Sequence, residues 1–348
     1  MVKGEISMEQ DVVLEIKNLR TCFYNNNKEL RAVDDLSYKV HRGECVAIIG
    51  ESGSGKTVSA LSILRLVSYP PGLVMGGEVL YNGQNLLEMG DAEYRQIRGK
   101  NISMIFQEPS AALNPVATIG DQIAENILLH SDMTKEEAWA KAERLLDEVG
   151  IPNPKERLKM YPFEFSGGMQ QRAMIAMAIS CDPDVLIADE PTTALDVTVQ
   201  AQVLECLNKL RREHNMALII ITHNLGIVAR YADSVKIMYG GKIIEDGSVN
   251  DVFLEPAHPY TLGLIRAVPR LDLPRSHGLQ TINGEPPDMS KVPANCCAFH
   301  FRCKYADEQC RCHRPKLEEV GKDHLCACFH KDLLEEERKE VVGNGTGA

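Results

Sequence analysis

The chain has 348 residues, of which 44% are hydrophobic and 25% charged, so it is long enough for two or three domains of ordinary globular composition. Its formal net charge of −11 disfavours non-specific electrostatic binding to nucleic acid. No N-terminal segment has the pattern of a secretion signal, and no apolar run approaches the roughly 20 residues that span a bilayer. We therefore predict a cytoplasmic protein, which another chain would have to hold at any membrane.

The chain order of apolar patterns predicts an α/β fold. The expected strands lie at residues 12–19, 32–40, 44–50, 77–86, 102–107, 184–191 and 217–223. One helix is expected at 57–67, and a helical region at about 118–182 contains clear helical patterns at 135–150 and 168–179. The later strands are almost wholly apolar, which is typical of a sheet that is covered on both faces.

The composition shifts to proline, histidine and cysteine after residue 255, where we expect a small appended domain. Its prolines at 256, 259, 286 and 287 are expected to fix extended or turn backbone and to keep the stretch from continuing a sheet or helix. Residues 331–348 are predicted to form a charged helix and a frayed tail.

The stretch GESGSGKT, residues 50–57, follows the apolar strand CVAII and opens a helical pattern. Backbone N–H groups of such a loop cradle phosphates, Lys56 can reach the β and γ phosphates, and Thr57 can bind Mg²⁺. The predicted nucleotide-binding residues of this loop are Gly50, Ser52, Gly53, Ser54, Gly55, Lys56 and Thr57.

Two further stretches complete a nucleotide-hydrolysing pattern. The apolar strand VLIADE places Asp189 and Glu190 at its carboxyl end, and we assign Asp189 to Mg²⁺ and Glu190 to the attacking water. In FSGGMQQR, Ser166 is a good N-cap for a helix that starts near Met169. The glycines let a ligand approach the N–H groups of that helix. We therefore predict that Ser166, Gly167 and Gly168 contact a nucleotide.

Taken together, these motifs resemble the ATP-binding cassette family. Walker A lies at 50–57, the signature FSGGM at 165–169, Walker B at 185–190, ALD at 194–196 and ITH at 221–223, in family order over some 175 residues. The resemblance implies a RecA-like P-loop NTPase core, an antiparallel β subdomain, an α-helical signature subdomain and a small cysteine-rich extension. The expected domains are a cassette at 11–255, with its helical subdomain at about 115–182, and an extension at 256–330.

The resemblance also assigns roles that the residues alone would not. Gln107 matches the glutamine that senses Mg²⁺ and the attacking water, and His223 matches the switch histidine at the γ-phosphate. Asp196 matches the acid that communicates between subunits, and Phe23 the aromatic side chain that stacks on adenine, with Tyr24 as its neighbouring candidate. The expected Mg²⁺ ligands are thus Thr57, Gln107 and Asp189, and the catalytic residues Glu190, His223 and Gln107.

Three C-terminal stretches indicate which branch of this family the chain resembles. PAHPYTLGLI (256–265), INGEPPD (282–288) and CAFHFRC (297–303) are similar to the oligopeptide and dipeptide importer branch. That branch implies an ATPase that forms a heterodimer with a second, different cassette ATPase. The pair would act with two membrane permeases and an extracytoplasmic solute-binding protein, so that the chain would be peripheral on the cytoplasmic face of the membrane. The alternatives are import of nickel or another small solute by the same architecture, and a soluble cassette ATPase that acts on nucleic acid or ribosomes.

Seven of the eleven cysteines lie between residues 296 and 328, and in a reducing cytoplasm such clustering favours metal binding over disulfides. Zinc sites with four cysteines usually contain C-x₂-C pairs, whereas iron–sulfur clusters tolerate wider spacing. The family pattern selects Cys297, Cys303, Cys310 and Cys328 and implies a [4Fe–4S] cluster. The alternatives are zinc and reduced or disulfide-linked cysteines. Cys296, Cys312 and Cys326 are near enough to substitute for a selected cysteine, and His300 is a fallback ligand.

Overall fold

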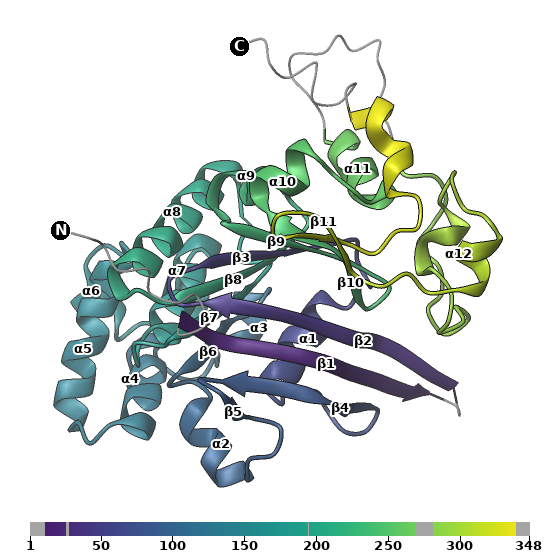
Figure 1. Cartoon of the computed structure of the whole chain (residues 1–348). Helices are drawn as coiled ribbons and strands as arrows, with labels where there is room; N and C mark the ends of the chain where they lie inside the picture. The colour runs from purple at the N-terminus through teal and green to yellow at the C-terminus, as the bar shows by residue number, and fades with distance from the viewer. Residues whose placement is uncertain (1–10, 26–27, 194, 269–280, 339–348) are drawn as a thin grey trace, which may run out of the picture. The chain divides into compact units, whose positions relative to one another are not determined.

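Two compact units make up the chain, and the computed structural model describes residues 11–25, 28–193, 195–268 and 281–338 of it (Figure 1). Unit 1 contains Met1–Glu15, Lys39–Cys45 and Val79–Ile221, and unit 2 contains Ile16–Tyr38, Val46–Glu78 and Thr222–Ala348. Residue 194 of the ALD motif and residues 339–348 of the predicted tail lie outside the described residues.

Three parallel strands form the sheet of unit 1. They are β6 (Ile102–Ile105), β7 (Val185–Asp189) and β8 (Ala217–Thr222), in the order β8-β7-β6. Ile102 lies opposite Val185, and Val185 opposite Ala217. Every residue of the three strands is buried, which confirms the prediction that these apolar strands are covered on both faces.

Helices account for most of the remaining unit 1 and confirm the helical region predicted at 118–182. They are α2 (Asp91–Ile97), α3 (Pro109–Ala112), α4 (Ile119–His130), α5 (Lys135–Glu148), α6 (Pro154–Arg157), the 3₁₀ helix η2 (Pro162–Glu164), α7 (Gly167–Ala178) and α8 (Val197–His214). Thr118 caps α4, and Thr134 forms a capping box with Glu137 at the start of α5. Helices α4, α5 and α7 pack on one another, as the teal ribbons of Figure 1 show.

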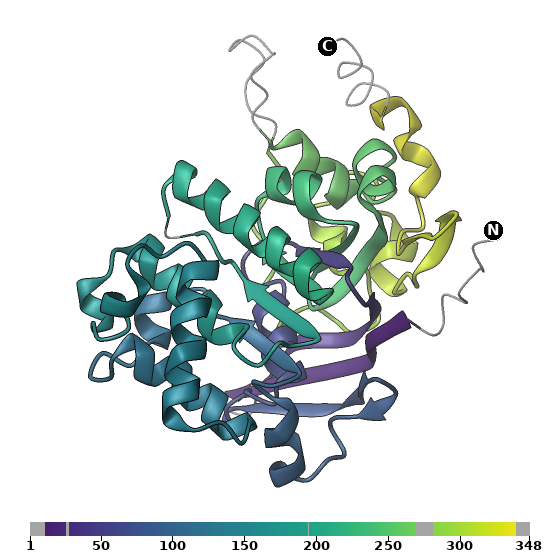
Figure 2. The same ribbon diagram turned by 90° about the vertical axis from the view of Figure 1, so that its left-hand side faces the viewer.

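Unit 2 is built on a sheet of order β11-β12-β10-β9-β3. Its strands are β3 (Cys45–Ile49), β9 (Ser234–Tyr239), β10 (Lys242–Ser248), β11 (Glu318–Gly321) and β12 (His324–Cys326). Strand β3 runs parallel to β9, and the other neighbours are antiparallel. The extension thus adds two strands to the edge of β10, which the sequence had not predicted; Figure 2 shows the same region turned by 90°.

The helices of unit 2 are α1 (Lys56–Ile63), α9 (Leu225–Tyr231), α10 (Val249–Leu254), α11 (Pro259–Arg266), α12 (Glu308–Cys312) and the 3₁₀ helices η4 (Ala298–Phe301) and η5 (Lys331–Leu334). Residues 335–338 continue η5 as α-helix, in agreement with the charged helix predicted there. A buried core joins β3, β9, α10, α11 and η4 around Tyr239, Tyr260 and Phe299.

The four-stranded sheet of the chain has the order β2-β1-β4-β5 and contributes residues to both units. Its strands are β1 (Val12–Asn25), β2 (Lys28–His41), β4 (Gly72–Tyr81) and β5 (Gln84–Asn85). The single strand predicted at 77–86 is wrong, because Asn82 and Gly83 both have positive φ and turn the chain into a hairpin between β4 and β5.

Two other predictions need correction. The helix expected at 57–67 ends at Ile63, because Arg65 adopts φ +51 in the left-handed region, where a helix cannot continue. The expectation of extended or turn backbone at the prolines beyond residue 255 is wrong for Pro259, which is the first residue of α11. The first helical turn accepts proline because its N–H group has no partner within the helix.

Candidate nucleotide site and cysteine cluster

The loop Gly50–Thr57 connects the buried strand β3 to α1 in unit 2. Gly55 is the N-cap residue of α1 at φ +100, and a Cβ atom there would lie 2.2 Å from the carbonyl oxygen of Ala32. Only glycine fits so close to another backbone segment in this conformation. Buried Lys56 donates from Nζ to the carbonyl oxygens of Gly50, at 2.7 Å, and Glu51, at 3.0 Å.

The outer side of the same loop is exposed at Ser52, Gly53 and Thr57. The first turn of α1 carries no acidic residue, so the positive end of the helix is not neutralised by its own side chains. Exposed backbone N–H groups, a lysine folded over the loop and a hydroxyl at Thr57 form a donor set that fits a polyphosphate with Mg²⁺.

The carboxyl end of β7 positions the two acids in unit 1. Asp189 is the last residue of the strand and is only 2% exposed. Glu190 follows at φ +43, a conformation that costs a residue with a side chain of order 1 kcal/mol or more. Its backbone N–H donates to the carbonyl oxygen of Ile221 at 2.9 Å, which holds the strained residue in place.

The Glu190 carboxylate accepts hydrogen bonds from Gln107 and Thr193. Gln107, which follows β6, donates from Nε2 to Oε2 at 3.3 Å, and Thr193 donates from Oγ1 to the same oxygen at 2.7 Å. The structure therefore brings together Gln107 and Glu190, which the sequence had placed at one site. The role of Thr193 was missed, and its position three residues after the predicted base in DEPTT is the signal that could have revealed it.

The signature stretch opens α7, which begins at Gly167, two residues earlier than expected. Ser166 is its N-cap, and its side chain accepts from the backbone N–H of Met169 at 3.4 Å. A Cβ atom on Gly168 would lie 2.8 Å from a methyl group of Val199 in α8. Ser166 and Gly167 are exposed, so a second molecule can reach this helix end.

The remaining predicted residues lie on both units. Asp196 caps α8 through hydrogen bonds from the N–H groups of Thr198 and Val199, at 3.1 and 3.0 Å. Exposed His223 follows β8, and Phe23 lies half-buried on β1 beside Gly72. Unit 2 thus carries the phosphate loop with Phe23 and His223, while unit 1 carries the predicted residues Gln107, Ser166, Gly167, Gly168, Asp189, Glu190 and Asp196.

The four cysteines selected by the family pattern affect one another electrostatically. Burial raises the pKa of the Cys297 thiol to about 12, and its neighbours Cys310, Cys328 and Cys303 add to the rise. Burial also raises the pKa values of Cys303 and Cys328 to about 11, and that of Cys310. Binding of a metal group would have to displace these protons.

Backbone N–H groups contact all four sulfur atoms. The N–H of His330 donates to Sγ of Cys328 at 3.3 Å. The N–H groups of Phe299, Ala306 and Asp307 lower the pKa values of Cys297, Cys303 and Cys310, respectively, against the larger effect of burial. Such bonds favour the thiolate over the thiol, so the backbone is arranged for sulfur atoms that carry negative charge.

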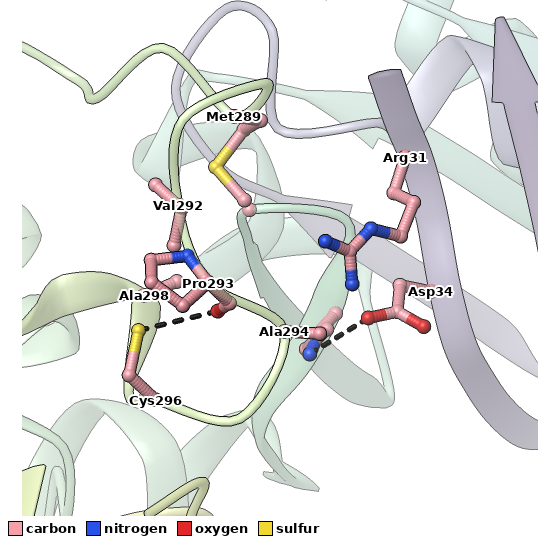
Figure 3. A pocket seen from close by; sticks show the side chains of 10 residues that line it. Arg31, Asp34, Met289, Val292, Pro293, Ala294, Cys296 and Ala298 are labelled. Carbon is pink, nitrogen blue, oxygen red and sulfur yellow. Dashed lines mark hydrogen bonds and ion pairs between the residues drawn. The ribbon is translucent and has the colours of Figure 1, made fainter. Parts of the chain in front are cut away.

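The other three cysteines of the extension have different surroundings. Cys296 donates from Sγ to the carbonyl oxygen of Pro293 at 3.2 Å and lines a small pocket that faces Arg31 and Asp34 (Figure 3). Exposed Cys312 donates to Glu308 at 3.2 Å. Burial strongly raises the pKa of the Cys326 thiol.

A second group of potential ligands was not predicted. Atoms of Asp307, Cys310 and His330 lie within 4.8 Å of one another, a spacing that suits a single metal ion. Within the described residues, the four family cysteines do not form a group with that spacing. His300 is occupied otherwise, since its Nδ1 lies 2.6 Å from the carbonyl oxygen of Cys297.

Comparison with known proteins gives two family matches. Residues 33–193 match the ABC transporter family, and residues 244–310 match the oligopeptide/dipeptide transporter C-terminal region. The chain is also 46% identical over 321 residues to the oligopeptide transport ATP-binding protein OppD of Escherichia coli, with 92% of this chain and 94% of that protein covered. The chain belongs to the ABC transporter ATPases.

A second relative agrees with this membership of the ABC transporter ATPases. The dipeptide transport ATP-binding protein DppD of Bacillus subtilis is 46% identical over 320 residues, which cover 92% of this chain and 95% of that protein. A solved structure described as the ATP binding subunit of an ABC transporter has a TM-score of 0.56 and 28% identity, covering 69% of this chain and 91% of its own. The predicted α/β cassette fold is therefore confirmed.

None of the helices formed by the described residues combines the length and the apolar character that crossing a bilayer requires.

Proposed function

We propose that this chain hydrolyses ATP and thereby drives the import of dipeptides or oligopeptides through a membrane transporter. The observation that carries the proposal is the occurrence, in one chain, of the phosphate loop with buried Lys56 and of the oligopeptide/dipeptide transporter C-terminal region at 244–310. Relatives named for oligopeptide and dipeptide transport, which align over nearly their whole length, favour peptides over nickel as the imported solute.

In this mechanism the loop Gly50–Thr57 binds the phosphates through its N–H groups, and Lys56 exchanges its loop carbonyl partners for phosphate oxygens. The side chains of Thr57, Asp189 and Gln107 would hold Mg²⁺. When bound, Mg²⁺ neutralises charge that develops on the transferred phosphoryl group. Phe23 stacks on the adenine ring, and His223 contacts the γ-phosphate.

Glu190 orients and deprotonates the attacking water. Hydrogen bonds from Gln107 and Thr193 end on the same oxygen, Oε2, and restrict the rotation of the carboxylate. Positioned base catalysis of this kind contributes a factor of about 100 to 10,000 to the rate.

The exposed signature Ser166–Gly168 indicates how the chain works with partners. We propose that it closes the ATP site of a second cassette ATPase, and that Asp196 takes part in communication between the two. Two permease subunits and an extracytoplasmic solute-binding protein would complete the transporter and hold the chain at the cytoplasmic face of the membrane. A role on nucleic acid or ribosomes is not favoured by the family matches.

We further propose that Cys297, Cys303, Cys310 and Cys328 hold a [4Fe–4S] cluster. The chemistry of the donor set fits, because four interacting thiols each receive a backbone N–H group at the sulfur atom. A single zinc ion, with Zn–S bonds of about 2.3 Å, would require closer sulfur atoms. The cluster would stabilise the fold of a segment with few apolar residues.

The catalytic proposal is tested by Glu190→Gln in the intact transporter. We expect ATP hydrolysis to fall by about 100-fold or more, since the amide cannot take up a proton. Equilibrium binding of ATP to the variant should stay within threefold of wild type. Hydrolysis above one tenth of the wild-type rate would contradict the assignment.

The cluster is tested by purification without oxygen. The protein should be brown, contain about four iron and four sulfide per chain, and lose the colour in Cys303→Ser. A colourless protein with one zinc per chain would assign the site to a single ion instead, with the group Asp307, Cys310 and His330 as the first place to look for it.

A further inference from the structure

The second residue of the phosphate loop, Glu51, is itself an anion. Its side chain is 27% exposed and belongs to the loop that must accept the negative phosphates of ATP. A carboxylate near phosphates in a partly buried site raises their free energy unless its charge is compensated. The loop therefore needs a cation that is not Lys56, because Lys56 serves the phosphates.

Arg302, from the C-terminal extension, supplies that cation. Its Nη1 lies 2.6 Å from Oε2 of Glu51 and its Nη2 lies 3.1 Å from Oε1, which is a bidentate pair. The guanidinium side chain is only 4% exposed. Its Nε donates to the carbonyl oxygen of Asn283 at 3.0 Å, so the arginine is fixed in orientation as well as charge.

Aromatic side chains of the same core surround this pair. The guanidinium carbon of Arg302 lies 6.0 Å from the ring centres of both Tyr239 and Phe299. Tyr260, which is fully buried in α11, accepts a hydrogen bond at its hydroxyl oxygen from the backbone N–H of Glu51 at 2.9 Å. The extension thus holds Glu51 by its backbone and by its carboxylate.

We propose that Arg302 is a positioning residue for the ATP site, which sets nucleotide affinity by neutralising and orienting Glu51. Arg302 directly precedes Cys303, and η4 with Phe299 lies between Cys297 and Cys303. The short segment that carries two of the proposed cluster ligands therefore also carries the counter-charge of the phosphate loop. Disruption of this segment would weaken ATP binding without touching a residue that contacts ATP.

The proposal rests on the assignment of Gly50–Thr57 as the phosphate loop and is tested by a double-mutant cycle that removes the two charges in the full chain. Binding of the fluorescent nucleotide mant-ATP with Mg²⁺ is measured for wild type, Arg302→Met, Glu51→Gln and the double variant. Arg302→Met should raise Kd about tenfold, because one uncompensated charge beside phosphates is worth roughly that factor. Glu51→Gln alone should bind at least as tightly as wild type.

The double variant separates charge compensation from loss of structure. It has no carboxylate left to compensate, so we expect its Kd to return to within threefold of wild type. In the intact transporter, Arg302→Met should raise KM for ATP and leave kcat within twofold, since Glu190 is untouched. A Kd for Arg302→Met equal to wild type, or a double variant as weak as Arg302→Met, would overturn the proposal.

Two further variants control for folding. Arg266→Met removes an arginine of the extension that pairs with Glu337 in the following charged helix, and it should leave Kd unchanged. Arg302→Lys keeps the charge and loses the bidentate geometry, so its Kd should lie between those of wild type and Arg302→Met. An Arg302→Lys protein that folds but binds as weakly as Arg302→Met would count against the proposal. Failure of the wild-type chain to bind mant-ATP would instead contradict the proposed function.

Discussion

Glu190 is the residue on which the catalytic account depends most directly. It is a non-glycine residue at φ +43, and the backbone bond to Ile221 and the side-chain bonds from Gln107 and Thr193 hold it there. Strain of this kind persists only where the surroundings fix it, and it is common at catalytic positions. These contacts thus fix the position of the carboxylate that we propose as the catalytic base.

Thr193→Val tests whether the hydrogen bond from Thr193 orients the Glu190 carboxylate. The substitution keeps the shape of the side chain and removes the 2.7 Å hydrogen bond to Oε2, which as a bond to a charged group is worth about 1.5 to 3 kcal/mol. We expect kcat for ATP hydrolysis in the intact transporter to fall about tenfold with KM nearly unchanged. Thr193→Ser keeps the hydroxyl group and should retain most of the rate, and equal losses in both variants would speak against an orienting bond.

At this scale the sequence was informative wherever a residue belongs to a continuous motif. Lys56, Thr57, Asp189 and Glu190 could be predicted because spacing along one loop or strand determines their neighbours. Arg302 could not, because its partner Glu51 lies 251 residues away and the contact depends on how the extension folds.

At the scale of elements, α11 and β12 are anchored by one buried carboxylate. Glu245 of β10 is fully buried and accepts from the N–H groups of Ala257, at 2.6 Å, and His258, at 3.0 Å, while His324 of β12 lies 2.9 Å away. Three of its four lone-pair sites are thus used by backbone and imidazole donors. This network fixes where the PAHPY stretch starts its helix.

The N-cap of α11 predicts a pH dependence. His258 is buried, its Nδ1 accepts from the N–H of Tyr260 at 3.0 Å, and burial lowers the pKa of the imidazole to about 3. An unfolded histidine has a pKa of about 6.5, so between pH 6.5 and 3 the unfolded chain binds more protons. The stabilisation is complete above pH 6.5 and is lost as the pH falls through this window.

His258→Asn removes this titration and keeps a good N-cap. Between pH 7 and pH 5 we expect wild type to lose about 2 kcal/mol more unfolding free energy than the variant. The measurement is denaturant unfolding at both pH values, followed by a probe in unit 2. Parallel losses in the two proteins would show that His258 titrates normally.

Elements were predictable from the sequence where they are long or wholly apolar, as β7, β8, α5 and α7 show. Strands β11 and β12 are three or four residues long and rich in polar side chains. Their strand conformation comes from pairing with β10, for example Glu245 with Cys326, and that pairing is not encoded locally. The prediction of extended or turn backbone at Pro259 failed for a different reason, because the effect of a proline depends on its position within a helix.

At the scale of the whole molecule, the chain carries one phosphate loop and one exposed signature. A cassette whose signature serves another subunit should lose activity in the complex when the signature is blocked, while its own nucleotide binding is unaffected. The domain limits predicted from the sequence, a cassette at 11–255 and an extension at 256–330, remain a prediction.

Ser166→Arg tests whether the signature serves the ATP site of a partner cassette and not the chain's own site. A bulky cation at the exposed N-cap of α7 would obstruct a nucleotide held by a partner cassette. We expect ATP hydrolysis by the intact transporter to fall about tenfold or more, with mant-ATP affinity of the isolated chain within twofold of wild type. Loss of binding in the isolated chain would mean that Ser166 serves the chain's own site.

Reconstitution of the complete transporter tests whether ATP hydrolysis by this chain drives peptide import. The complete transporter, placed in lipid vesicles with its solute-binding protein, is supplied with ATP and either a mixture of short peptides or nickel ions, and uptake and phosphate release are measured together. We predict that peptides stimulate both about tenfold, and that Glu190→Gln abolishes both. Stimulation by nickel with no response to peptides, or uptake that survives in Glu190→Gln, would contradict the account.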